Sequence, residues 1–291
     1  QSGGDTSDYP ENALETVFYP TNKIRLPVNK ENVIKSGLVK EKDSDLILDY
    51  IDIDLPESII TKNQIMMLDI LANNNWERPI YFTGGSYEES EYIWMKDYLQ
   101  LDGLVYKLVP IKTSIENNPY EMGRIDSDLM YDIVKKWSWG NSESDEIYHD
   151  PETRKNSISF RSNMARLAEK LIDEGKNKKA KEVLDLAVQK MPLDYFGYYS
   201  LVVPMIDTYY RLGDIKSAQD LAAQIAEKYR DEMEYFSSLK ASEQYFLGEE
   251  IITQAERYRT LMEAILVNKD KIQLNKSLIQ FQKVNSKNLQ A

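Results

Sequence analysis

A repeated pattern of small and apolar residues in the second half of the chain constrains the fold more than any other feature. If Gly175 marks a turn between two helices, small or apolar residues flank it at helical spacing. The same series recurs around Gly213, with a step of 38 residues. Helices that approach closely need small residues at their contact, and a glycine suits the point where the chain reverses. The pattern predicts two helical hairpins. The repeated positions are Met164, Leu167, Ala168, Ala180, Leu184 and Ala187, then Met205, Ile206, Tyr209, Ala218, Ala222 and Ile225.

This spacing resembles the tetratricopeptide repeat, in which hairpins of two helices stack on their neighbours. The step is longer than the roughly 34 residues of that repeat, and the extra residues lie around 193–198. The second unit has Arg230 where a proline equivalent to Pro192 is expected. We therefore predict an all-α, tetratricopeptide-like solenoid over residues 157–291. Further helices, expected to form a degenerate third unit and a cap, are predicted over residues 232–247, 249–268 and 271–283.

The first half of the chain shows a mixed pattern. Residues 50–55 (YIDIDL) alternate strictly between apolar and acidic side chains, which is typical of a half-buried strand. Strands and helices that alternate with short links favour a small α/β domain over residues 22–140, giving an α+β, helix-dominated protein overall. Residues 1–21 are predicted to be a tail, and the polar residues 141–156 a linker. The other predicted strands are 23–28, 79–83 and 104–111, and the predicted helices are 30–36, 61–72, 88–99 and 126–137. The apolar face of the helix at 61–72 is predicted to comprise Ile65, Leu68, Ile70 and Leu71.

Composition excludes several classes of function. The net charge of −12 opposes binding to nucleic acid, and no apolar run reaches the roughly 18 residues that membrane insertion requires. The chain has no cysteine and a single histidine, His149. Disulfides, thiolate zinc sites, histidine-based triads and multi-histidine metal sites are therefore excluded within it. We predict no cofactor. Because the chain begins Gln-Ser-Gly-Gly, we expect a fragment or a processed form.

The stretch WERPIYFTGG, residues 76–85, has the outline of a phosphate-binding loop. Gly84 and Gly85 follow a predicted strand and precede a predicted helix. However, the glycine spacing of the known phosphate loops is missing, and no basic residue follows until Lys96. Three carboxylates also begin the helix, which opposes a bound phosphate. A plain turn between strand and helix is the better interpretation.

Three acidic pairs match the D-x-D pattern with which many glycosyltransferases hold a metal and a nucleotide sugar. With 48 acidic residues, such matches are expected by chance. The first pair lies on the polar side of its strand, so a solvated face is the favoured interpretation. A soluble enzyme that uses Asp52 and Asp54 with a metal stays open as a hypothesis. Asp126 is predicted to cap its helix. The pairs are Asp43 and Asp45, Asp52 and Asp54, and Asp126 and Asp128.

Aromatic clusters raise the hypothesis of a sugar-stacking platform. Trp137 and Trp139 stand in the run WSWG, and residues 195–199 are rich in tyrosine. With 20 tyrosines in the chain, core and hairpin packing is the more common role of such residues. His149 has no sequence neighbour that makes it a ligand or a base, so we interpret it as a loop histidine.

Tetratricopeptide pairs usually hold a peptide or a partner segment in a concave groove lined by their first helices. The alternative is that two units form a shallow groove that packs on the first half of the chain. The residues predicted to face the groove are Glu169, Asp173, Asp207, Tyr210 and Arg211.

Three blocks of sequence resemble one known family: residues 67–82 (MLDILANNNWERPIYF), 98–112 (YLQLDGLVYKLVPIK) and 123–131 (GRIDSDLMY). They are similar to the C-terminal soluble part of large multi-spanning membrane proteins common in Bacteroidetes. That family is similar to GT-C-type protein O-mannosyltransferases, and its soluble tail carries tetratricopeptide-like helices. The resemblance runs from about residue 22 to about residue 245. In GT-C enzymes the catalytic acid lies near the first membrane span, so no catalytic residue is carried over to this chain.

The resemblance implies an extracytoplasmic, periplasmic location and a covalently attached membrane-embedded domain as partner. We expect a non-catalytic accessory domain of a glycosyltransferase-like protein, which helps it fold, dimerise or position an acceptor protein or peptide. The alternative is a free-standing periplasmic module that binds glycans or peptides.

Overall fold

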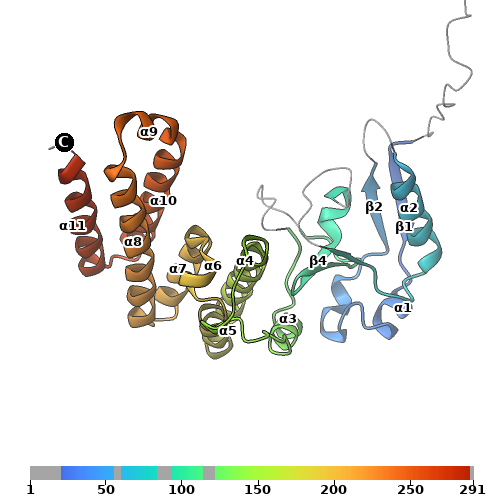
Figure 1. Cartoon of the computed structure of the whole chain (residues 1–291). Coiled ribbons are helices and arrows are strands. Elements are labelled where there is room, and N and C mark those ends of the chain that lie inside the picture. The colour runs from blue at the N-terminus through green and yellow to red at the C-terminus, as the bar shows by residue number, and fades with distance from the viewer. Residues whose placement is uncertain (1–20, 56–59, 84–92, 114–121, 289–291) are drawn as a thin grey trace, which may run out of the picture. The chain divides into compact units, whose positions relative to one another are not determined.

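The computed structural model describes residues 21–55, 60–83, 93–113 and 122–288 (Figure 1). Within them the chain forms two compact units. Unit 1 comprises the described residues of Gln1–Pro79, Tyr87–Tyr98 and Val109–Ser114, and unit 2 those of Ile80–Ser86, Leu99–Leu108 and Ile115–Ala291.

Unit 1 is built on a two-stranded antiparallel sheet. Strand β1 (Lys23–Pro27) pairs with β2 (Tyr50–Asp54), and Ile24 lies opposite Ile53. The predicted alternation is confirmed, because Ile51 and Ile53 are fully buried while Asp52 is exposed. The remaining elements of the unit are α1 (Lys30–Lys35), the 3-10 helix η1 (Glu41–Leu46), α2 (Lys62–Asn74) and the 3-10 helix η2 (Ile93–Tyr98).

Helix α2 begins as predicted, but only part of its expected apolar face is buried. Thr61 and Gln64 form a capping box at its start. The predicted apolar face is wrong at Ile65 and Ile70, which are 56% and 55% exposed. Only Gln64 and Leu71 are buried. These two lie two turns apart, so the helix contacts the unit along one narrow stripe.

The sheet of unit 2 corrects the expected α/β topology. Strands β3 (Tyr81–Thr83), β4 (Leu99–Asp102) and β5 (Val105–Leu108) pair in the order β3-β5-β4, and both pairings are antiparallel. Only Gly103 and Leu104 separate β4 from β5. A parallel crossover needs a dozen or more residues, so this link imposes a hairpin. The predicted helix 88–99 is also wrong at its end, since Leu99 opens β4.

The polar side of this sheet contains a buried ion pair. Lys107 Nζ lies 3.0 Å from Asp102 Oδ2, and both side chains are at most 4% exposed. Gln100 donates a hydrogen bond to the other oxygen of Asp102 at 2.8 Å. Removing one partner of such a pair would leave an uncompensated charge in the interior.

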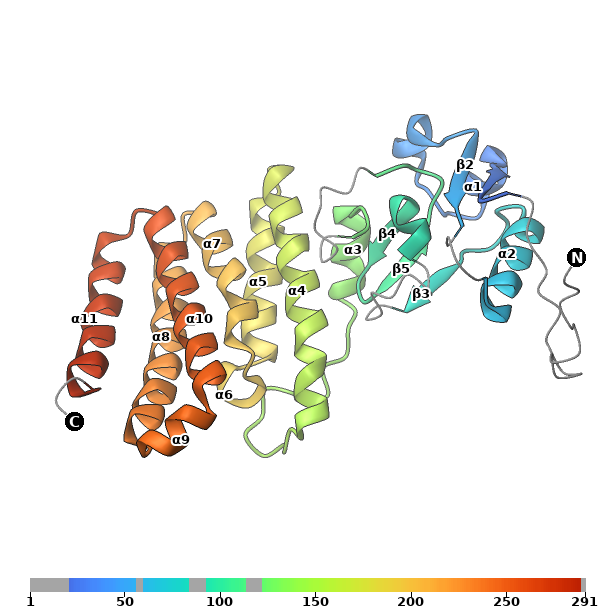
Figure 2. The ribbon, with the colours of Figure 1, turned by 90° about the horizontal axis from the view of Figure 1, so that it is seen from above.

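From Pro151 onward every long element in the described chain is a helix. Figures 1 and 2 show the long helices from α4 to α11 packed side by side, with α10 and α11 both against α8. Before them, α3 (Ser127–Val134) has Asp126 as its predicted N-cap. The helices are α4 (Pro151–Asp173), α5 (Asn177–Lys190), α6 (Leu193–Phe196), α7 (Val203–Arg211), α8 (Ile215–Ser238), α9 (Ala241–Phe246), α10 (Gly248–Val267) and α11 (Lys271–Asn288), with a 3-10 turn η4 (Tyr199–Val202) before α7.

The two predicted hairpins are confirmed as α4–α5 and α7–α8. All twelve repeated positions are buried, none more than 3% exposed. Gly175 and Gly213 lie in their turns with φ of 73° and 75°. The extra residues between the hairpins form α6 and η4, as expected for a lengthened turn.

Two predicted boundaries in this half are wrong. Residues 232–238, predicted to open a new helix, continue α8 to Ser238. Glu234 is exposed and Glu232 is half-buried, and the apolar stripe of α8 continues past them to the buried Phe236. Helix α4 also begins inside the predicted linker, because Asp150 caps it and Pro151 occupies its first turn.

Among the described helices, none combines the length and the apolar character that crossing a bilayer requires. The described residues likewise hold no cluster of three or more acidic, histidine or cysteine side chains arranged for a metal ion.

Candidate functional site

The predicted groove residues form two sets of contacts. Asp173, at the end of α4, accepts a hydrogen bond from Arg211 of α7 at 2.6 Å. Both side chains remain partly exposed, at 59% and 38%. The pair connects the two hairpins. Glu169 precedes Asp173 by about one turn of α4 and is half-buried.

The other two groove residues contact the chain itself. Asn268, in the turn between α10 and α11, donates to Asp207 at 2.9 Å. Tyr210 is buried and donates to Asp270 at 3.0 Å, and burial followed by this hydrogen bond raises its pKa. The same carboxylate accepts from Gln219 at 2.6 Å. At α7 the predicted groove is therefore filled in part by the chain's own turn.

The D-x-D pairs are engaged in structural contacts. Arg25 donates to both oxygens of Asp52, at 2.8 and 3.0 Å, and Lys23 lies 3.5 Å from Asp54. These are cross-strand pairs, because the register sets each acid opposite its base. Asp128 lies 2.7 Å from Lys176 and 2.8 Å from Lys179. Asp52, Asp54 and Asp128 are thus each paired with a lysine or an arginine, while Asp126 accepts from the amide of Leu129 as the N-cap of α3.

The opening residues of WERPIYFTGG have a structural role in unit 1. Trp76 is buried and donates from Nε1 to the carbonyl of Pro27 at 2.8 Å. Asn75 and Trp76 both have left-handed backbone conformations, with φ of 49° and 61°. Gly84 and Gly85, on which the phosphate-loop hypothesis rests, lie outside the described residues.

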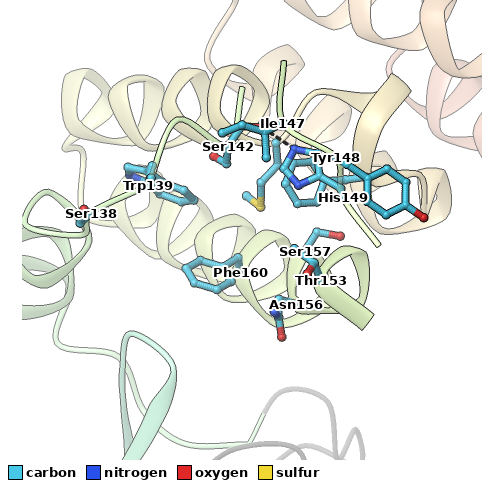
Figure 3. A pocket seen from close by; sticks show the side chains of 13 residues that line it. Ser138, Trp139, Ser142, Ile147, Tyr148, His149, Thr153, Asn156, Ser157 and Phe160 are labelled. Carbon is cyan, nitrogen blue, oxygen red and sulfur yellow. Dashed lines mark hydrogen bonds between the residues drawn. The ribbon is translucent and has the colours of Figure 1, made fainter. Parts of the chain in front are cut away.

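An open pocket of about 380 Å³ lies in unit 2, between the residues that follow α3 and the first turns of α4 (Figure 3). This volume is within the range of small-molecule sites. Hereafter we refer to it as the aromatic pocket. None of the 13 described residues that line it carries a carboxylate, ammonium or guanidinium group. Its main walls are Trp139, Tyr148, His149, Asn156, Phe160 and Phe196.

Local sequence explains how the pocket forms. Gly140 and Asn141 follow the tryptophans with φ of 56° and 58°, and glycine and asparagine tolerate this conformation best. The chain turns there and returns to Asp150, whose carboxylate accepts from the amides of Glu152 and Thr153. A hydrogen bond from the Thr153 hydroxyl, followed by those from the two amides, lowers the pKa of Asp150.

Several hydrogen bonds fix the returning loop. Ser142 Oγ donates to the carbonyl of Lys190 at 2.6 Å, and Lys190 forms an ion pair with Glu143. Arg154 Nε donates to the carbonyl of His149 at 2.9 Å. The loop is therefore attached at its start to the end of α5 and at its end to α4.

A buried arginine supports the far wall. Arg161, 1% exposed, donates to the carbonyls of Gly197 at 2.5 Å and Met191 at 2.7 Å. Burial lowers its pKa to about 10. Because these two carbonyls flank α6, the guanidinium holds Phe196 in the wall, with its centre 5.9 Å from that ring.

The aromatic side chains form one contiguous group. Trp137 packs edge to face on Trp139 at 5.7 Å and on Phe160 at 4.9 Å between ring centroids. Trp139 and Phe160 are 5.5 Å apart. Both are only half-buried, and Tyr148 is 80% exposed at the rim. Aromatic surface is thus available to a ligand.

His149 is the one buried titratable side chain in the pocket's lining. It is 6% exposed, and its ring lies 4.6 Å from that of Phe196. Nε2 lies 3.0 Å from the carbonyl oxygen of Ser142, shown dashed in Figure 3. A carbonyl only accepts, so Nε2 carries a hydrogen. Nδ1 is buried and has no partner among the described residues.

The pocket joins three features that were separate in the sequence. The WSWG run supplies Trp139, the 141–149 segment supplies His149, and the tyrosine-rich run supplies Phe196, while Tyr195 stacks on His149 at 6.1 Å. Phe160 and Arg161 were not predicted from the sequence as part of a site. A signal for Phe160 was present, since Thr153, Asn156, Ser157 and Phe160 follow the i, i+3, i+4, i+7 spacing of one helical face.

Comparison with known proteins gives one match. Residues 3–129 are similar to TMEM260-associated domain 2, a family described by that name. This segment covers less than half of the chain and includes the blocks 67–82 and 98–112. It ends within α3, so the aromatic pocket and the helical hairpins follow it. No curated protein and no solved structure matches the chain.

Proposed function

We propose that this chain is a non-catalytic accessory domain, attached on the periplasmic side to a membrane-embedded, glycosyltransferase-like protein. The observation that carries the proposal is the similarity of residues 3–129 to TMEM260-associated domain 2. It coincides with the blocks that resemble the soluble tails of proteins similar to protein O-mannosyltransferases. The role of the domain is to bind, and its principal partners are the membrane-embedded part and an acceptor protein or peptide.

The helical hairpins supply the acceptor-binding surface in this proposal. Their turn glycines, small buried residues and stacking support a tetratricopeptide-like array, whose first helices face a partner. The exposed part of that surface centres on Asp173 and Arg211, with Glu169 beside them. Asp207 and Tyr210 lend it rigidity through the 268–270 turn.

A binding role also agrees with the state of the acidic residues. Asp52, Asp54 and Asp128 are each paired with a lysine or arginine, and hydrogen bonds from Arg25 and Lys176 lower the pKa of Asp52 and Asp128. A general acid at neutral pH needs a raised pKa instead. Their geometry is that of surface ion pairs.

Deleting residues 22–291 from the full-length protein tests the proposal. We expect the membrane-embedded part to be produced while glycosylation of its acceptors falls. Modification of every acceptor at the unchanged rate would contradict the acceptor-binding role.

A charge exchange separates partner binding from stability. Asp173→Arg and Arg211→Asp each break the ion pair, and the double variant restores it with reversed polarity. We expect the double variant to recover thermal stability while acceptor modification stays low. Recovery of both would assign the pair a structural role only.

The aromatic pocket favours one alternative, a free-standing periplasmic module that binds glycans or peptides. The complete reading frame distinguishes the two proposals. Several hundred preceding residues with repeated apolar spans would eliminate the free-standing module, and their absence would eliminate the attached domain.

A further inference from the structure

We propose that the aromatic pocket is a binding site for a neutral pyranose sugar. The inference goes beyond the accessory role and does not depend on it, because the pocket lies outside the acceptor surface around Asp173 and Arg211. It rests on the pocket's charge, its half-exposed aromatic rings and the unpartnered nitrogen of His149.

The absence of charge in the lining selects the ligand class. Phosphates and carboxylates are usually bound by arginine, lysine or helix N-termini, and ammonium groups by carboxylates. The 13 described lining residues provide none of these side chains. The carboxylate of Asp150 also occupies the first amides of α4, which leaves that helix end unsuited to an anion. The ligand is therefore neutral.

The aromatic surface selects among neutral ligands. One face of a pyranose ring presents C–H groups with slight positive charge, and these pack on the electron-rich face of an aromatic ring. Trp139 and Phe160 line the pocket and are half-buried, and Tyr148 stands exposed at its rim. A sugar can lie against such rings while its hydroxyls point to the polar part of the lining.

His149 provides the polar feature that a ligand would complete. With Nε2 donating to Ser142, the neutral ring has an acceptor lone pair at Nδ1. This atom is buried without a partner among the described residues, and a buried acceptor without a hydrogen bond destabilises a protein. A sugar hydroxyl would donate to it. The exposed amide of Asn156, at the rim, offers both a donor and an acceptor.

The pocket is held in shape before any ligand binds. The contacts of Ser142 with Lys190, of Arg154 with His149 and of Arg161 with Met191 fix three sides of it. A site that is already formed loses little conformational entropy on binding. A small ligand that makes few contacts, such as a monosaccharide, can therefore bind to it.

Ligand-observed saturation-transfer NMR on the whole chain tests the inference. The probes are the methyl glycosides of glucose, galactose, mannose and N-acetylglucosamine, each at about 10 mM because single sugars bind with Kd near the millimolar range. Indole and p-cresol serve as probes for an aromatic peptide side chain. We expect at least one glycoside to receive saturation, with the strongest transfer to its ring C–H protons.

Matched variants test whether the saturation transfer to the glycoside arises in the aromatic pocket. Tyr148→Ala removes a rim aromatic that is 80% exposed, and Tyr245→Ala removes one that is 84% exposed on α9. Asn156→Asp preserves shape while removing the amide donor. His149→Gln keeps a donor and an acceptor, and His149→Leu removes both. We expect an affinity loss of about tenfold for Tyr148→Ala, Asn156→Asp and His149→Leu, equivalent to 1.4 kcal/mol.

The outcomes separate cleanly. A glycoside signal that weakens in Tyr148→Ala and Asn156→Asp and persists in Tyr245→Ala supports the site. Because both rim side chains are exposed, these variants retain the fold even if the His149 variants do not. No signal from any glycoside, a signal insensitive to both rim variants, or binding of indole and p-cresol alone would overturn the inference.

Discussion

The two helical hairpins of unit 2 bury the same kinds of residue around their turns and differ in what contacts them. In α4–α5 and in α7–α8, small and apolar side chains at equivalent positions are almost completely buried. Around the first hairpin lie α3, an ion-pair cluster and the aromatic pocket. The second hairpin is contacted by α10 and α11, whose turn binds Asp207 and Tyr210.

The repeat pattern therefore specifies the buried residues of each hairpin but not the residues on its outer surface. The same packing code leaves an aromatic pocket beside the first helix of one hairpin and a polar contact with the 268–270 turn beside the first helix of the other. Functional sites are expected where the repeat pattern ends, on residues that its spacing does not specify.

The largest predicted effect tests whether the two interiors are equivalent. Leu184→Ala and Ile225→Ala each remove a fully buried side chain, one from each hairpin. We expect both to lower the free energy of unfolding by about 2–4 kcal/mol, because each leaves a cavity. Urea unfolding monitored by circular dichroism measures this. The control is Leu266→Ala, at a site 58% exposed, with a change below about 0.5 kcal/mol. A loss of stability in only one of the two variants would show that the two hairpin interiors are not equivalent.

The turn glycines provide the next test. Gly175→Ala and Gly213→Ala introduce a side chain where φ is 73° and 75°, although neither new Cβ would meet a neighbouring atom. We expect each to cost about 1 kcal/mol through backbone strain alone. Gly248→Ala is the matched control, because that glycine begins α10 without a positive φ. It should be neutral or stabilise by about 0.5 kcal/mol. Unequal costs at the two turns would show that the hairpins are not equivalent.

A smaller effect concerns the stability of the fold at acid pH. Asp128, Glu174, Lys176 and Lys179 form an ion-pair cluster beside the first hairpin. Hydrogen bonds from Lys176 and Lys179 lower the pKa of Asp128. Burial opposes ionisation of Glu174, but hydrogen bonds from Lys176, Ser127 and Lys170 outweigh it and lower its pKa to about 2. Since both carboxylates have folded-state pKa values below their unfolded values, they stabilise the fold above about pH 4.5. That contribution is lost as pH falls from there to about 2.

Asp128→Asn checks this assignment. We expect a loss of about 0.5–1 kcal/mol at pH 7, typical of partly exposed ion pairs, and a shallower decline of stability below pH 4.5. Free energies of unfolding measured from pH 7 to pH 2.5 provide the comparison, with Asp220→Asn, an exposed site on α8, as control. An unchanged acid slope would show that the cluster does not link α3 to the first hairpin.

Sequence predicted the hairpins well because periodic burial is a local property. The positions of Ala180 and Ala218 follow from helical spacing alone, and so do the turns at Gly175 and Gly213. The strand at residues 50–55 was predicted for the same reason. Periodicity failed for α2, where Ile65 and Ile70 are apolar and yet exposed, since the width of a buried stripe depends on what packs against it.

Contacts between segments far apart in the chain could not be predicted from local sequence patterns in the same way. Strand direction in unit 2 depends on which segments pair, and the two-residue link after Asp102 decided it. In the candidate site, Trp139, His149 and the 195–199 run were each noted for their residue type. Their convergence required the turn at Gly140 and Asn141 and the support of Arg161, which no local pattern indicates.

The central claim is that the open pocket of the first hairpin is a ligand site whose unmet group is Nδ1 of His149. Because the chain has one histidine, ¹⁵N labelling of histidine gives a single pair of ring signals. At pH 8, where histidine is ordinarily neutral, we predict hydrogen on Nε2 and a bare Nδ1. The Nδ1 resonance should shift upfield when a glycoside that binds in the saturation experiment is added, while Nε2 stays unchanged. Hydrogen on Nδ1 in the free protein, or an Nδ1 resonance that a saturating glycoside does not move, would contradict the account.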